Sequence, residues 1–134
     1  MSKELGSGLK ILILDDEKDI CHFTKEYFIQ RGFDVHAVLK GKAAITFAKK
    51  EKPDIALLDI HLNKEEMSGI DVLKAIREIN SDCYCIMVTR DDNKEKEDEA
   101  RQLGAFDYLT KLNTAKSLDK IILRAVKKLR KEGK

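Results

Sequence analysis

Residues 9–17 read LKILILDDE, a short apolar run that ends on three acidic residues. An apolar run of this length is typical of a buried strand. Residues 54–59 repeat the arrangement as DIALLD, so that a second apolar run ends on the carboxylate of Asp59. The two stretches therefore predict two buried strands, each with acidic side chains at its carboxyl end.

Strand-like and helix-like segments alternate five times along the chain. The expected strands cover residues 9–14, 33–39, 54–59, 83–89 and 105–110. The expected helices, where apolar residues recur at helical spacing, cover residues 16–30, 42–51, 69–79, 93–103 and 115–130. Alternation with short connections predicts an α/β fold, a doubly wound five-stranded parallel sheet with helices on both faces and right-handed crossovers.

Two of the expected helices differ in how firmly they should pack. Residues 16–30 carry one apolar side, which we expect to face the sheet and which consists of Ile20, Phe23, Tyr27 and Phe28. Residues 93–103 are highly charged and have few apolar anchors, so we expect this helix to be weakly packed.

The chain length of 134 residues suits one domain. We place that domain at residues 9–131, with a flexible lead at 1–8 and a tail, or the start of a linker, at 132–134. The net charge of +2 gives no argument for a nucleic-acid partner. The basic run at the C-terminus indicates a solvated helix end, which the helix dipole favours.

Membrane and secretory classes are not expected. No apolar run approaches the roughly 20 residues that cross a bilayer, and the first eight residues contain no apolar segment of a secretory signal. The three cysteines are odd in number and have no framework spacing, which fits a reducing compartment. We therefore expect a cytoplasmic protein with no membrane contact.

The ends of the expected strands carry the residues with the most chemistry. In open parallel sheets, ligands bind beyond the carboxyl ends of the strands. There the chain places three carboxylates, a hydroxyl and an amine, namely those of Asp15, Asp16, Asp59, Thr89 and Lys111. Carboxylates that share a crevice repel one another, and Mg²⁺ offsets such repulsion through oxygen ligands. The sequence thus predicts a Mg²⁺ site beside a lysine.

This set suits the transfer of a phosphoryl group to a carboxylate. An aspartate can attack phosphorus and form an aspartyl-phosphate. The charge that develops on the transferred oxygens needs a metal, a cation and hydrogen-bond donors. We expect Asp59 to be the acceptor, Asp15 and Asp16 to hold the metal with it, and Lys111 and Thr89 to bind phosphoryl oxygens.

The chain resembles the response-regulator receiver domains of two-component signalling, which are CheY-like. The resemblance rests on four motifs in the right order at strand ends: ILILDDE, DIALLDI, IMVT and GAFDYLTK. It implies a flavodoxin-like strand order 2-1-3-4-5. It also implies that Asp59 is the phosphoacceptor, that Asp15 and Asp16 bind Mg²⁺ with the backbone carbonyl of His61, and that Lys111 binds the phosphate.

The same resemblance implies a switch and its partners. Thr89 would be the switch hydroxyl and Tyr108 the switch aromatic. The phosphoryl group would come from a sensor histidine kinase, a phosphotransfer protein or a small phosphodonor. The output would pass to a downstream protein or a missing output domain, or through a homodimer on the face of the fourth helix, fifth strand and fifth helix. Such a protein is a switch rather than an enzyme, and assists only its own phosphotransfer and dephosphorylation.

Three positions depart from the family pattern. The loop 60–68 after the acceptor is longer than usual and lacks proline. Leu112 follows Lys111 where the family has proline, and we expect a trans peptide bond there. Arg90 follows Thr89 where a small residue is common, and we expect it to narrow access to the site or to pair with Asp91 and Asp92.

These departures keep a second reading open, a pseudo-receiver that serves as an interaction module and is never phosphorylated. A small flavodoxin-like enzyme or nucleotide binder is a third reading. The absence of a glycine-rich loop after the first strand argues against it, because the acidic residues there would repel a phosphate.

The cysteines and histidines indicate packing more than chemistry. Cys83 and Cys85 alternate across Tyr84, so we expect both to face one side of a buried strand. Cys21 is expected in the core as well. His22 and His36 are expected at the surface, whereas the side chain of His61 is expected to overhang Asp59.

Overall fold

The computed structural model describes residues 4–62, 67–90, 92–111 and 115–134. The strands are β1 Lys10–Leu14, β2 Asp34–Val38, β3 Ile55–Asp59, β4 Tyr84–Thr89 and β5 Asp107–Thr110. The helices are α1 Lys18–Ile29, α2 Gly41–Glu51, α3 Gly69–Ile79, α4 Lys94–Gln102 and α5 Ala115–Lys131. Each of the ten elements lies within about two residues of its expected place.

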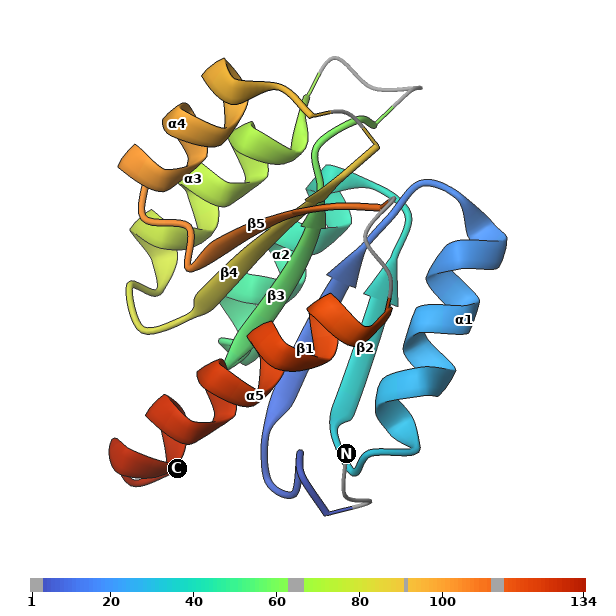
Figure 1. Cartoon of the computed structure of the whole chain (residues 1–134), viewed down its shortest axis with the longest axis vertical. Coiled ribbons are helices and arrows are strands. Elements are labelled where there is room, and N and C mark those ends of the chain that lie inside the picture. The colour runs from blue at the N-terminus through green and yellow to red at the C-terminus, as the bar shows by residue number, and fades with distance from the viewer. Residues whose placement is uncertain (1–3, 63–66, 91, 112–114) are drawn as a thin grey trace.

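The five strands form one parallel sheet in the order β2-β1-β3-β4-β5. Helices α2, α3 and α4 cover one face, and α1 and α5 cover the other (Figure 1). The predicted fold class and strand order are therefore confirmed. The strand β3 is buried at all five positions, as a strand covered on both faces requires. No helix in the described ranges is long and apolar enough to cross a membrane.

Helix α1 corrects one expectation about its apolar side. Its buried residues are Cys21 and Phe28, whereas Ile20 is 37% exposed and Phe23 is 68% exposed. The prediction that Ile20 and Phe23 pack on the sheet is wrong. Two neighbouring stripes of this helix are apolar in sequence, and the tertiary arrangement turns only one of them toward the sheet. The other stripe is left at the surface.

Gly69 brings α3 close to the end of β3. A Cβ atom at this position would lie 2.0 Å from the carbonyl oxygen of Asp59. The Gly69 amide donates to the carbonyl of Ile60 at 2.9 Å, and Ser68 and Asp71 cap the helix reciprocally. The absence of a side chain at Gly69 thus lets the start of α3 contact the strand that carries Asp59.

Helix α4 is weakly anchored, as the sequence predicts. Ala100 is its buried residue, and the remaining residues are charged or polar. The cysteine prediction is also confirmed, because Cys83 and Cys85 lie in the same core cluster beneath α3 and α4, while Cys21 is buried on the opposite face of the sheet. The expected surface positions of His22 and His36 are confirmed too.

Candidate functional site

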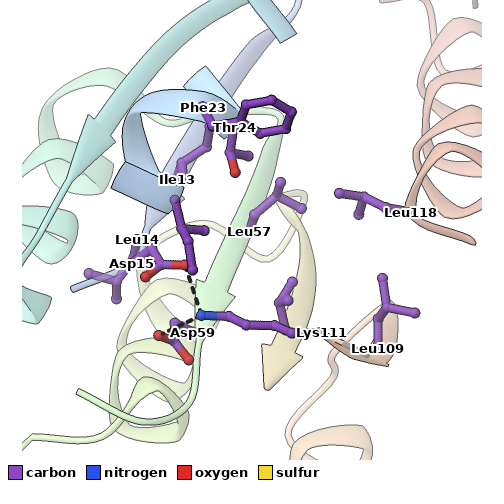
Figure 2. Close-up of a pocket in the computed structure, with 12 residues that line it drawn as sticks. Ile13, Leu14, Asp15, Phe23, Thr24, Leu57, Asp59, Leu109, Lys111 and Leu118 are labelled. Atoms are coloured by element: carbon purple, nitrogen blue, oxygen red, sulfur yellow. Dashed lines mark hydrogen bonds and ion pairs between the residues drawn. The ribbon is translucent and has the colours of Figure 1, made fainter. Parts of the chain in front are cut away.

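The carboxyl ends of β1, β3, β4 and β5 bring predicted site residues together. Asp15 follows β1, Asp59 and Thr89 end β3 and β4, and Lys111 follows β5. Figure 2 shows the Lys111 side chain reaching toward the carboxylates of Asp15 and Asp59. Asp59 is 1% exposed and Thr89 is fully buried. The tertiary structure therefore places residues that are up to 96 positions apart in sequence in one pocket.

Lys111 is the cation at the centre of this pocket. Its Nζ donates to Oδ2 of Asp15 at 3.0 Å and to Oδ2 of Asp59 at 3.3 Å. A third acidic side chain, that of Glu17, lies 3.7 Å from the same nitrogen. The backbone amide of Lys111 donates to the carbonyl of Thr89, which fixes the start of the lysine side chain against the end of β4.

Burial and charge alter the ionisation of the central pair. Burial raises the pKa of the Asp59 carboxyl, and the charge of Asp15 adds to the rise while Lys111 opposes it. For Lys111, burial lowers the pKa, but the hydrogen bond with Asp15 and the charges of both aspartates outweigh it and raise the pKa above its ordinary value. The lysine is therefore held in its charged form, beside a carboxylate whose ionisation costs free energy.

An acidic cluster stands beside the lysine. Carboxylate oxygens of Asp15, Asp16 and Glu17 lie within 4.8 Å of one another. The amide of Glu17 donates to Oδ1 of Asp15 at 2.9 Å, which fixes the orientation of that carboxylate. Three hard oxygen donors at this spacing, in a pocket with too little positive charge, fit a hard divalent cation such as Mg²⁺. Glu17 belongs to the DDE motif but was not among the predicted metal ligands. The position of its side chain depends on where α1 begins, which the sequence does not fix to the residue.

The oxygens of Asp59 are positioned by two neighbours. Oδ2 pairs with Lys111, and Oδ1 accepts a hydrogen bond from the amide of His61 at 3.2 Å. The backbone at His61 thus contacts the carboxylate. Residues 63–66, which make the loop between β3 and α3 long, lie outside the described residues, and so does Leu112.

Arg90 forms an ion pair with Glu17, which also lies near Lys111. Its Nη1 lies 3.7 Å from Oε1 of Glu17, which links the end of β4 to the start of α1. We predicted a partner in Asp91 or Asp92; Asp91 lies outside the described residues, and Glu17 is an acidic partner that the sequence reasoning did not name. Glu17 therefore stands between two cations, Arg90 and Lys111.

Tyr108 lies in the middle of β5 and is buried against the cluster on the side of α3 and α4. Its residue exposure is 9%. The residue that the resemblance implies as the switch aromatic therefore packs inside the core in this structure.

A cavity of about 280 Å³ opens next to Lys111. Figure 2 shows Lys111 and Asp15 at one end and apolar side chains around the rest, from α1, α5 and the sheet. Those apolar neighbours include Ile13, Phe23, Leu57, Leu109 and Leu118. The cavity was not predicted from the sequence, and the exposed residues Ile20 and Phe23 of α1 belong to its lining.

The site consists of a buried carboxylate, Asp59, that pairs with Lys111 next to a cluster of acidic side chains able to hold a hard divalent cation. Asp59 is available to attack an electrophile, and Lys111 and a divalent cation can neutralise the negative charge that such a reaction develops. The described part of the pocket suits phosphoryl transfer, as the sequence predicted.

Comparisons with known proteins agree on one family. A family model for the response regulator receiver domain matches residues 11–123. The regulatory protein AtoC of Escherichia coli is 33% identical over 117 residues, which are 87% of this chain and 25% of that protein. The sporulation initiation phosphotransferase F of Bacillus subtilis is 31% identical over 102 residues, 76% of this chain and 81% of that protein.

A solved structure gives the same result for the fold. A CheY-like response regulator receiver domain protein from Methanospirillum hungatei superimposes with a TM-score of 0.86 at 26% identity, covering 92% of this chain and 98% of that one. Three of the curated relatives are much longer than this chain, which covers 25%, 55% and 42% of their lengths.

Proposed function

This chain belongs to the response regulator receiver domain family, and we propose that it accepts a phosphoryl group on Asp59 in a Mg²⁺-dependent reaction and thereby switches a partner-binding face. The observation that carries the proposal is the pairing of Lys111 with both Asp15 and Asp59 at the end of the sheet. We place the receiver domain at residues 9–131.

The transfer step follows from the positions of the side chains. An oxygen of the Asp59 carboxylate attacks phosphorus, an O–P bond forms, and the N–P bond of a phosphohistidine or the O–P bond of a small acyl phosphate breaks. The leaving nitrogen or oxygen keeps the electron pair of that bond. The amine of Lys111 pairs with the Asp59 carboxylate before the transfer. After the transfer it pairs with the phosphoryl oxygens, which a short movement of the lysine side chain brings within reach. Mg²⁺, when bound, supplies further neutralisation of that charge.

We assign the metal ligands to the acidic pocket. Asp15 and Asp16 are the proposed pair, with Asp59 and the backbone carbonyl of His61 completing the set on the protein side. Glu17 is close enough to Asp15 and Asp16 to take part or to compete. A divalent cation held there would neutralise carboxylates that pair with Lys111, and the lysine would then be available to the phosphoryl group.

The switch would run from the site to the face of α4, β5 and α5. The Thr89 hydroxyl donates to a phosphoryl oxygen, and its movement changes the space available to Tyr108. Helix α4 has a single buried anchor in Ala100, so its position costs little to change. Phosphorylation then shifts the population between two arrangements of this face.

Partners follow from the surface beside the site. Ile20 and Phe23 are exposed on α1 at the rim of the cavity, and we propose that the histidine kinase or phosphotransfer protein packs there. The output would come from a downstream protein, from a homodimer through the α4–β5–α5 face, or from a further domain such as those that longer relatives have room for. We expect these events in the cytoplasm, without nucleic-acid contact by this domain.

The test is an intact-mass measurement after incubation with Mg²⁺ and acetyl phosphate. We expect one phosphoryl adduct, lost in Asp59→Asn, abolished by a chelator, and retained in the matched variant Asp54→Asn at the opposite end of β3. A protein that takes no phosphoryl group from acetyl phosphate or from a panel of histidine kinases would instead be a pseudo-receiver that acts only by contact.

A further inference from the structure

The side chain of Asp107 lies at an edge of the sheet where three elements meet. Strand β5 is the last strand of the sheet, beside β4. Figure 1 shows α4 and α5 on opposite sides of this strand. The Asp107 side chain is 19% exposed, so solvent reaches it only in part. A carboxylate in this place can contact both helices.

Two arginines from different helices pair with the Asp107 carboxylate. Nη2 of Arg101, in α4, lies 3.2 Å from Oδ1. Nη2 of Arg124, in α5, donates to Oδ2. The backbone amide of Tyr108 donates to the same Oδ1 at 2.8 Å. One side chain of β5 therefore contacts α4, α5 and the backbone of the residue that the resemblance implies as the switch aromatic.

Further contacts hold the two arginines in place. Nη2 of Arg101 also lies 2.9 Å from Oε2 of Glu97, in the same helix. The guanidinium carbon of Arg124 lies 5.1 Å from the centroid of the Phe106 ring, which is a cation–π distance. The ion pairs thus form a connected network from α4 across β5 to α5. Such networks are the exception to the rule that surface ion pairs contribute little.

This network matters more for α4 than an equal one would for the neighbouring helix. Ala100 is the buried residue of α4, whereas α3 buries five of its residues. The burial of one small side chain and the formation of one ion pair have effects of similar size. The pair between Arg101 and Asp107 is therefore comparable with the apolar anchor of α4.

We propose that Asp107 is a positioning residue, whose carboxylate holds α4 beside β5 and α5 and so opposes a displacement of α4. Its link to Asp59 rests on the proposed function. In this structure Lys111 pairs with the Asp59 carboxylate, which is the pairing before the transfer. Loss of the Asp107 contacts and phosphorylation of Asp59 then favour the same displaced arrangement, and two shifts of one equilibrium reinforce each other.

The first test measures hydrogen exchange of the backbone amides in residues 94–102 by mass spectrometry, with no phosphodonor present. Asp107→Asn and Arg101→Met should each speed exchange there by about threefold to fivefold, because an ion pair that holds the helix is lost. Asp98→Asn is the matched control, since Asp98 pairs with Lys94 inside α4, and its effect should be about twofold at most. Unchanged exchange in α2 separates this local effect from a loss of global stability.

The second test measures the rate at which acetyl phosphate labels Asp59 in saturating Mg²⁺. Asp107 begins β5, whereas Lys111 follows the other end of this strand, so an effect of Asp107 on the rate has to pass through the α4–β5–α5 face. Asp107→Asn should label about threefold faster than the wild type. Asp107→Glu keeps the carboxylate and should label near the wild-type rate, as should Asp98→Asn.

The proposal is overturned if α4 exchanges no faster in Asp107→Asn than in Asp98→Asn, because the carboxylate then does not hold the helix. Faster exchange with an unchanged labelling rate would overturn the link between Asp107 and Asp59. A wild-type chain that takes no label from any donor would contradict the proposed function, whereas the exchange measurement would still decide whether Asp107 holds α4.

Discussion

Charged side chains are arranged differently at the two ends of the sheet. At the carboxyl end, Asp15 and Asp59 are buried and share one lysine, with two more acidic residues beside them. At the amino end, Lys10 pairs with Glu51 at 2.8 Å and Tyr84 donates to Glu132 at 2.7 Å, and both contacts lie at or near the surface. Burying more acidic side chains than the nearby cation can neutralise lowers the free energy of unfolding and makes the carboxylates reactive. A surface ion pair changes that free energy only slightly.

The largest effect is expected from replacing Lys111, the cation that pairs with both buried aspartates, Asp15 and Asp59. Lys111→Met should slow phosphorylation of Asp59 by about 10²–10³-fold, because the charge on the transferred oxygens then lacks its lysine. The measurement is the rate of acetyl phosphate labelling in saturating Mg²⁺. Lys10→Met, at the amino end, is the matched control and should label at the wild-type rate. Equal rates for all three proteins would mean that Lys111 has no part in the transfer.

The next effect concerns backbone packing at the same two ends. Gly69→Ala should lower the free energy of unfolding by about 3 kcal/mol, since its Cβ would lie 2.0 Å from the carbonyl oxygen of Asp59. Gly8→Ala, just before β1, meets open space, but its φ of +77° should still cost about 1 kcal/mol. Urea unfolding curves compare the two, and a larger loss at Gly8 would contradict the close approach of α3 to β3.

A subtler effect tests whether the buried carboxylate destabilises the fold. Burial raises the pKa of Asp59 above its ordinary value of 3.8. The folded state is therefore penalised where the carboxyl is ionised, and the penalty disappears as the pH falls through the folded-state pKa toward the ordinary value. Asp59→Asn should raise the melting temperature of the metal-free protein at neutral pH, and the gain should shrink as the pH falls. A variant less stable than the wild type at pH 7 would refute this.

Arg90 should affect access more than chemistry. Its ion pair with Glu17 lies beside the acidic cluster, and we expect Arg90→Ala to speed labelling by acetyl phosphate a few-fold because a long side chain next to Thr89 is removed. Glu17→Gln breaks the same pair from the other side and should also speed labelling if Glu17 is not needed for the metal. An unchanged rate in Arg90→Ala would show that the arginine does not limit entry.

The smallest effect is expected at the amino end, and with the opposite dependence on pH. The hydrogen bond from Lys10 lowers the pKa of Glu51, so this pair stabilises the fold above the ordinary carboxyl pKa and stops doing so as the pH falls through the lowered value. Glu51→Gln should slightly lower the melting temperature at neutral pH and leave it unchanged in acid. A loss in Glu51→Gln larger than the gain in Asp59→Asn would reverse the comparison between the two ends.

Periodicity predicted the elements well because the strands are short apolar runs with acidic or turn residues after them. Helix α3 was predicted with both ends correct, since Gly69 opens an apolar periodic stretch of high contrast. Helix α1 was predicted correctly at Phe28 and Tyr27, which pack against the core, but wrongly at Ile20 and Phe23, because only contacts with the sheet distinguish two adjacent apolar stripes. The pairing of Arg90 with Glu17 was not predicted, because Arg90 follows β4 and Glu17 follows β1, and only the packing of the sheet brings these two strand ends together.

The sequence by itself determined the parallel α/β class, the order of the elements and the placement of Asp15, Asp16, Asp59, Thr89 and Lys111 at the carboxyl ends of strands, because apolar runs and strand ends are local features. Only the tertiary structure decided which of these side chains touch. It gave Lys111 two aspartate partners, added Glu17 to the acidic cluster, left Ile20 and Phe23 exposed around a cavity, and brought the sulfurs of Cys83 and Cys85 to 3.9 Å. Distances between residues far apart in the chain depend on how helices pack on the sheet, which local periodicity does not encode.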